Sequence, residues 1–140
     1  MAKISKDLDR KIRRQAKNRC GYCLNPQELM PFKLEIEHIH PRALDGKTVE
    51  ENLWLACREF NAHKAAKIKA IDRLTGKTVK LFNPRRQNWR EHFEFSQDFS
   101  EIIGKTACGR ATVDALQMNN IYQTNARLAW SETSKFPPKD

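Results

Sequence analysis

The residues best suited to chemistry lie between positions 35 and 64, in the stretch EIEHIHPRALDGKTVEENLWLACREFNAHK. An acidic residue stands directly before a histidine at Glu37 and His38, and two asparagines follow at Asn52 and Asn61. Carboxylate and amide oxygens are ligands that a hard divalent cation prefers. An imidazole that titrates near neutral pH can activate water. The stretch therefore carries the residue types that metal-assisted hydrolysis requires.

Three short elements must bring these side chains together. Apolar and acidic residues alternate over residues 32–39, which predicts a strand that ends at the acid–histidine pair. The apolar run at residues 53–57 predicts a second short strand, and the good helix formers from 58 to about 70 predict a helix. Asn61 and Lys64 are three residues apart, so they are neighbours on that helix. The expected order is strand, loop, strand, helix.

The combination of E-H-I-x-P, a central N-L and C-x₃-N-x₂-K resembles the HNH endonucleases, whose core is the ββα-metal (His-Me finger) fold. The resemblance implies that Glu37 and Asn61 bind a catalytic divalent cation, Mg²⁺ or another. It implies that His38 is the general base and that Asn52 orients its imidazole, in an H-N-N variant of the motif. Many members have Asp where this chain has Glu37. The implied activity is divalent-metal-dependent endonucleolytic hydrolysis of phosphodiester bonds in DNA.

The expected fold class is α+β, with a ββα-metal core over residues 20–70. A basic N-terminal helix precedes this core, and short strands and helices follow it. We expect one HNH nuclease domain over residues 1–130 and a disordered polar tail over residues 131–140. Trp89, His92 and Phe93 resemble a W-x₂-H-F element that follows the core in some bacterial members, and core packing is its default role.

Cysteines near the core raise the question of a second metal. Cys20, Cys23 and Cys57 match family positions that bind structural zinc, but Phe60 stands in place of the fourth cysteine. A structural zinc site normally has four protein ligands, and the spacing of His63 does not suit it as a substitute. Alternatively, Phe60 packs against three free thiols, which behave as small apolar groups. We favour the zinc-free interpretation and keep the zinc site as the alternative.

A formal net charge of +9 and a pI near 9.6 favour a polyanionic partner. The first 19 residues contain eight basic and two acidic side chains, and residues 6–18 are expected to form an amphipathic helix. A solvated basic face is an equally good interpretation, and charge alone does not separate DNA from RNA or an anionic membrane surface. The candidate nucleic-acid-binding residues are Arg10, Arg13, Arg14, Lys17, Arg42 and Lys64.

The remaining composition excludes several classes of protein. No apolar run approaches the roughly 20 residues that span a bilayer, so we expect no membrane association. The N-terminus has no apolar signal region, and four cysteines without one favour a reducing, cytoplasmic compartment. We expect no small-molecule substrate, and nothing indicates an oligomeric state. The alternative functions are a non-catalytic nucleic-acid-binding module, which the Phe60 replacement favours, and, more remotely, a redox protein that uses Cys20 and Cys23.

Overall fold

The structure, a computed structural model, describes residues 4–140 and belongs to the α+β class, as predicted. Its helices are α1 (Lys6–Gln15), α2 (Arg58–Lys64), α3 (Trp89–His92), α4 (Ala107–Leu116) and α5 (Ile121–Trp130). Its strands are β1 (Glu35–His38), β2 (Leu53–Ala56), β3 (Lys69–Ile71), β4 (Thr78–Lys80), β5 (Phe93–Phe95) and β6 (Ile102–Gly104). Short 3₁₀ turns cover Gln27–Leu29, Arg42–Leu44 and Glu50–Asn52. None of the helices within residues 4–140 has the length and apolar character to span a bilayer.

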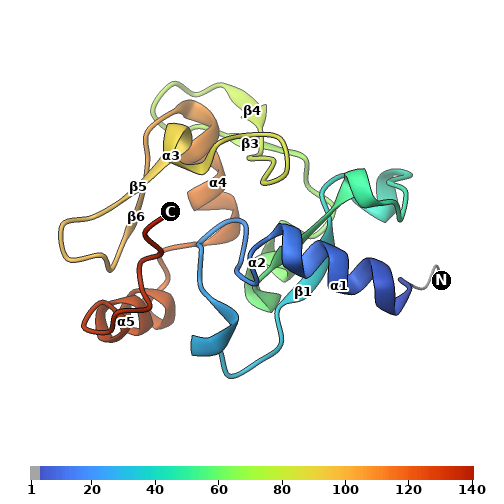
Figure 1. Ribbon diagram of the computed structural model, residues 1–140. Helices are drawn as coiled ribbons and strands as arrows, with labels where there is room; N and C mark the ends of the chain where they lie inside the picture. The colour runs from blue at the N-terminus through green and yellow to red at the C-terminus, as the bar shows by residue number, and fades with distance from the viewer. Residues whose placement is uncertain (1–3) are drawn as a thin grey trace.

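The strands form three separate two-stranded antiparallel sheets, β1–β2, β3–β4 and β5–β6. In the first sheet Glu37 pairs with Trp54 and His38 with Leu53, and α2 begins immediately after β2. Figure 1 shows α1 and the β1–β2 sheet on one side of the molecule and α3, α4 and β3–β6 on the other. The predicted order of strand, loop, strand and helix is thus present.

Helix α2 ends earlier than residue 70, the end expected from its composition. Lys64 turns back to the end of β1, where its Nζ donates to the carbonyls of His38 (3.1 Å) and Ile39 (2.9 Å). Ala65 then has φ of 48° and ψ of −126°, a positive-φ conformation outside both helical regions that interrupts the helix. The break in α2 therefore coincides with long-range hydrogen bonds made by Lys64, and helix propensity does not predict it.

Helix α1 begins as its sequence predicts, because the Ser5 hydroxyl caps it by accepting from the Leu8 amide (3.1 Å). The helix stops at Gln15 rather than at 18, since Lys17 and Asn18 both have positive φ and reverse the chain. Its buried Ile12 lies on the side that packs against β2. The C-x-x-C segment at residues 20–23, called here the cysteine turn, follows this reversal and is buried in the core.

One hydrophobic core joins the two sides of the molecule. Cys20 and Phe60 belong to the same buried cluster as Phe82 and Phe93, which come from the C-terminal part of the chain. The rings of Phe82 and Phe93 meet edge to face with centroids 5.0 Å apart. At Gly21 even a β-carbon would overlap the Trp54 indole, so the backbone of the cysteine turn must approach β2 closely.

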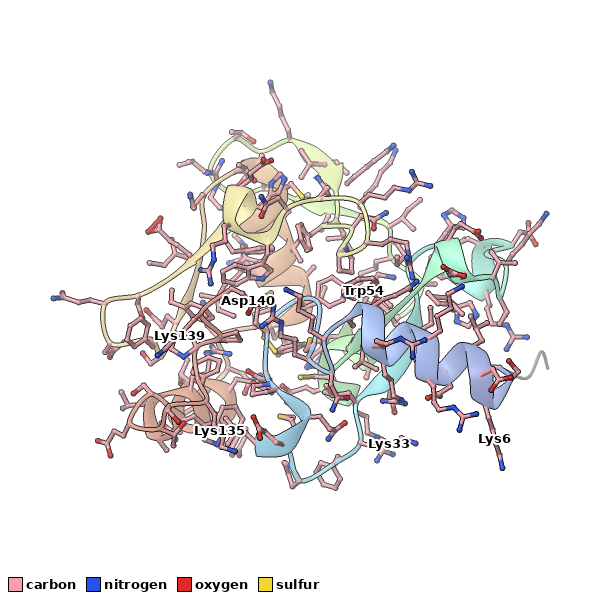
Figure 2. The ribbon with its side chains drawn as sticks, in the orientation of Figure 1. Lys6, Lys33, Trp54, Lys135, Lys139 and Asp140 are labelled. Atoms are coloured by element: carbon pink, nitrogen blue, oxygen red, sulfur yellow. The ribbon has the colours of Figure 1, made fainter. Side chains whose placement is uncertain are left out.

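The C-terminal tail is packed onto the protein, which corrects the expected disorder of residues 131–140. Phe136 is 2% exposed and contacts the rings of Phe95 and Trp130. The side chain of Asp140, labelled in Figure 2, forms ion pairs with Lys17 (2.5 Å) and Arg19 (2.9 Å). A single buried aromatic and one terminal carboxylate anchor a segment whose average polarity suggested that it would not pack.

Candidate active site

The central feature of the site is a carboxylate buried between the cysteine turn and α2. Glu37 on β1 is 1% exposed, and its Oε1 accepts a hydrogen bond from the Tyr22 hydroxyl (2.5 Å). Lys64 Nζ lies 3.9 Å from the same oxygen. The other oxygen, Oε2, is buried without a hydrogen-bond partner among the described residues. A buried acceptor of this kind costs free energy unless another group satisfies it.

Burial dominates the ionisation of this carboxylate. Loss of solvent raises the pKa of Glu37 to about 7, although the charge of Lys64 and the hydrogen bond from Tyr22 oppose the rise. Burial likewise lowers the pKa of Lys64, against the attraction of Glu37. Both shifts show that desolvation outweighs the attraction across 3.9 Å. A cation at the unpartnered oxygen would favour the ionised carboxylate.

His38 follows Glu37 on β1, and its half-buried ring is held from the loop between β1 and β2. Its Nε2 lies 2.8 Å from the Thr48 hydroxyl oxygen. The pKa of His38 is lowered by burial first and then by the positive charges of Arg42 and Lys64. The environment therefore favours a neutral imidazole near pH 7, which is the state that a general base needs.

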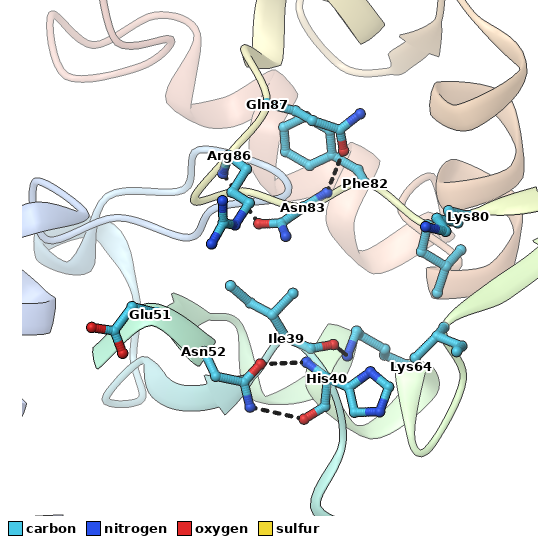
Figure 3. A pocket seen from close by; sticks show the side chains of 12 residues that line it. Ile39, His40, Glu51, Asn52, Lys64, Lys80, Phe82, Asn83, Arg86 and Gln87 are labelled. Atoms are coloured by element: carbon cyan, nitrogen blue, oxygen red, sulfur yellow. Dashed lines mark hydrogen bonds between the residues drawn. The ribbon is translucent and has the colours of Figure 1, made fainter. Parts of the chain in front are cut away.

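Asn52 fixes the loop that carries Thr48, and its side chain does not touch the imidazole of His38. Its Oδ1 accepts from the His40 amide (2.8 Å), and its Nδ2 donates to the carbonyls of His40 (3.0 Å) and Lys47 (2.9 Å). Figure 3 shows the two bonds to His40. These bonds close the loop that carries Thr48, the residue whose hydroxyl lies beside the His38 ring.

Asn61 lies at the same β1–α2 interface as Glu37 but pairs with a different acid. Its Nδ2 donates to Glu35 Oε1 (3.1 Å), and Glu35 Oε2 lies 3.7 Å from Arg58 Nε. Glu35 and Glu37 are two residues apart on a strand and so share one face. Within residues 4–140 no hydrogen bond joins Asn61 to Glu37, because Asn61 bonds to Glu35 while Glu37 bonds to Tyr22 and lies beside Lys64.

Sequence reasoning missed Tyr22, Thr48 and Glu35 as parts of this site. The alternation along β1 places Glu35 on the same face as Glu37, so that pattern could have identified it. Tyr22 lies inside the C-x-x-C turn and Thr48 in an irregular loop, where no periodicity indicates the direction of a side chain. Their contacts depend on long-range packing.

Most of the cations predicted to bind nucleic acid are already engaged within the protein. Arg10 pairs with Asp7, Arg13 pairs with Asp9 and donates to the Leu34 carbonyl, and Lys17 pairs with Asp140. Lys64, another of these candidates, is 2% exposed and donates to the His38 and Ile39 carbonyls. Arg14 and Arg42 are exposed and form no ion pair within residues 4–140.

The three cysteines of the predicted knuckle converge. The sulfur atoms of Cys20, Cys23 and Cys57 lie within 4.8 Å of one another, and the Cys57 amide donates to Cys20 Sγ (3.3 Å). Burial opposes ionisation of Cys20, but hydrogen bonds from the other two thiols and the backbone lower its pKa. Such a group can bind a soft metal ion. Phe60, fully buried in the same cluster, supplies no fourth ligand.

The buried Glu37 predicts an unusual pH dependence of stability. A carboxyl group whose folded-state pKa is raised to about 7 contributes stability at low pH that is lost as the pH rises through that value. Glu37→Gln should therefore gain stability over the wild type between pH 5 and pH 8, by on the order of 3 kcal/mol. Urea unfolding of both proteins in EDTA measures this difference. A difference independent of pH would contradict the assigned burial penalty.

The zinc-free interpretation of the cysteine cluster predicts the metal content. Because Phe60 cannot coordinate a metal, protein purified without added zinc should contain far less than one zinc per chain. Cys57→Ala should leave that content unchanged. Elemental analysis by mass spectrometry measures both proteins. Near-stoichiometric zinc that disappears in Cys57→Ala would show instead that three thiolates suffice.

The central segment of the chain is similar to a known protein family. Residues 20–67, which contain the cysteine turn, the β1–β2 sheet and α2, match the family model described as HNH endonuclease. No curated protein and no solved structure matches the chain. The matched segment includes 48 of the 140 residues and ends before β3. Residues 20–67 are therefore similar to the HNH endonuclease family, which confirms the resemblance inferred from the sequence for this segment.

Proposed function

We propose that the protein is a divalent-metal-dependent endonuclease that hydrolyses phosphodiester bonds in DNA. The observation that carries this proposal concerns two adjacent residues of β1. Glu37 is a buried carboxylate with one oxygen that lacks a hydrogen-bond partner, and His38 is an imidazole whose lowered pKa favours its neutral form. HNH proteins act as nucleases on nucleic acids, and the match over residues 20–67 supports the same general class of reaction for this chain.

The residues present fit a catalytic cation. Glu37 Oε2 is a buried acceptor that lacks a partner, and the Asn61 amide and Glu35 carboxylate lie at the same interface. Oxygen donors of this kind suit Mg²⁺, which keeps several coordination positions for water and phosphate oxygens. When bound, such a cation would supply Lewis-acid stabilisation of charge on the phosphate and the leaving 3′-oxygen.

His38 is the group that activates water. In the tautomer whose Nε2–H donates to the Thr48 hydroxyl, Nδ1 carries the lone pair that accepts a proton. The water oxygen forms a bond to phosphorus as His38 takes this proton, and the bond between phosphorus and the 3′-oxygen breaks. Because only the neutral imidazole accepts a proton, the rate should fall as the pH drops through the lowered pKa of His38.

Replacement of His38 tests the reaction directly. His38→Ala should lower the rate of plasmid cleavage in Mg²⁺ by roughly 10² to 10⁴, the usual contribution of a general base. His63→Ala, which removes an imidazole on α2 that has no assigned role, is the matched control and should cleave like the wild type. EDTA should abolish cleavage by every protein. Equal cleavage by His38→Ala and the wild type would overturn the assigned role, and a non-catalytic nucleic-acid-binding module would remain.

The hydrogen bond from Tyr22 should influence how well the site binds its cation. Tyr22→Phe keeps the buried ring and removes the donor to Glu37 Oε1, so the carboxylate is less ionised and less fixed. We expect the Mg²⁺ concentration for half-maximal cleavage to rise roughly tenfold or more, with a smaller change in the rate at saturating Mg²⁺. Tyr122→Phe, at a residue 78% exposed on α5, is the control. Superimposable Mg²⁺ titrations of all three proteins would disprove this role.

A further inference from the structure

A cavity of about 590 Å³ adjoins the active site and has two walls that differ in origin. One wall comes from the HNH segment and includes His40, Asn52 and Lys64. The other comes from residues 80–87, which lie beyond that segment, and includes Lys80 and Arg86. Figure 3 shows Asn83 and Arg86 facing Asn52 across the gap.

Two residues that line the cavity are neighbours of the proposed catalytic residues. Ile39, the residue after His38, lines it. So does Lys64, whose Nζ donates to the His38 carbonyl at 3.1 Å and lies 3.9 Å from Glu37 Oε1. A ligand in the cavity could therefore contact Ile39, which follows His38 in the chain, and Lys64, which is hydrogen-bonded to the His38 carbonyl.

The second wall is held rigidly in place. Phe82 is 2% exposed, and its amide donates to the Thr112 hydroxyl on α4 (2.9 Å). The Asn83 amide donates to Gln87 Oε1 (2.7 Å), and Asn83 Oδ1 accepts from the Arg86 amide (3.2 Å). Groups on this wall are thus held facing the cavity before any ligand binds, which lowers the entropy cost of binding.

Two cations on this wall are not used by the protein itself. The side chains of Lys80 and Arg86 are exposed and form no hydrogen bond or ion pair within residues 4–140. The adjacent Arg85 is different, because it donates to the Leu53 carbonyl and stacks on the Trp54 ring. Glu51 is the one carboxylate among the lining residues of the described chain. The cavity therefore presents an excess of positive charge with amide donors between the cations.

We propose that this cavity binds the sugar–phosphate backbone of the DNA strand beside the phosphate that is cut, with Lys80 and Arg86 contacting its phosphates. The proposal rests on the proposed function, because it assigns the substrate's position at the same site. Mobile lysine and arginine side chains next to amide donors are the groups that proteins use to position a nucleic-acid backbone. The residues that bind substrate thus come from outside the segment that supplies the catalytic groups.

The test measures binding separately from cleavage. His38→Ala in EDTA, which does not cut, is titrated against a fluorescently labelled DNA duplex by anisotropy over a series of salt concentrations. Adding Lys80→Ala or Arg86→Ala should weaken binding, and each should reduce the slope of log K against log salt by about 0.9, the value for one phosphate contact. Adding Glu51→Gln should tighten binding, because it removes the opposing charge.

Lys33→Ala is the matched control, since Lys33 is equally exposed but does not line the cavity. Thermal unfolding by circular dichroism confirms that every variant remains folded. If Lys80→Ala and Arg86→Ala bind with the same slope as Lys33→Ala, this inference is wrong while the nuclease proposal stands. If the His38→Ala parent binds no DNA and the wild type cuts none in Mg²⁺, the proposed function fails together with the inference.

Discussion

The burial of the Glu37 carboxylate beneath the Tyr22 hydroxyl is the constraint on which the site depends. A charged group placed in the interior must be compensated, and here one oxygen has a donor while the other has none. Lys64 contributes charge, but at 3.9 Å it is too far for a hydrogen bond. The protein without metal therefore keeps an acidic group in an unfavourable setting. A buried ionisable group whose free-energy cost is not compensated within the protein is typical of functional sites.

The C-terminal part of the chain supports this arrangement from outside the HNH segment. Trp89 donates from its indole to the carbonyl of Tyr22 (2.7 Å), which fixes the backbone of the cysteine turn. Trp89 also packs against Phe93. The W-x₂-H-F element therefore has a structural role, because its Trp89 fixes the backbone of Tyr22, whose hydroxyl donates to Glu37. Arg85 binds the Leu53 carbonyl at the start of β2. The cysteine turn and the β1–β2 hairpin are thus each held by a residue that follows them in sequence.

Local patterns predicted the elements well, and long-range contacts explain what they missed. Alternation on β1, the apolar run of β2 and the Ser5 cap of α1 are properties of neighbouring residues, and the structure agrees with them. The end of α2 coincides with contacts of Lys64 to the end of β1, and the tail packs through contact of Phe136 with Phe95. Residue spacing alone predicts neither of these contacts.

In the candidate site, too, local patterns predicted some residues and missed those whose contacts are long-range. The motif identified the acid and the histidine, whose positions on β1 follow from alternation. The partner of each came from elsewhere, Tyr22 from the cysteine turn and Thr48 from the loop that Asn52 closes. The resemblance assigns Asn52 the orientation of the imidazole, and in the structure its side chain bonds to the backbone of His40 and Lys47. Side-chain partners across a loop are set by three-dimensional closure, for which one sequence gives no signal.

The position of Tyr22 inside the C-x-x-C turn also links the geometry of that turn to the acid. A substitution that displaces the turn would move the phenol and so remove the donor to Glu37 Oε1. Gly21 is restricted in this way, because any side chain there would collide with the Trp54 indole. The shape of the turn, apart from any metal that its thiols bind, therefore determines whether the carboxylate keeps its hydrogen bond.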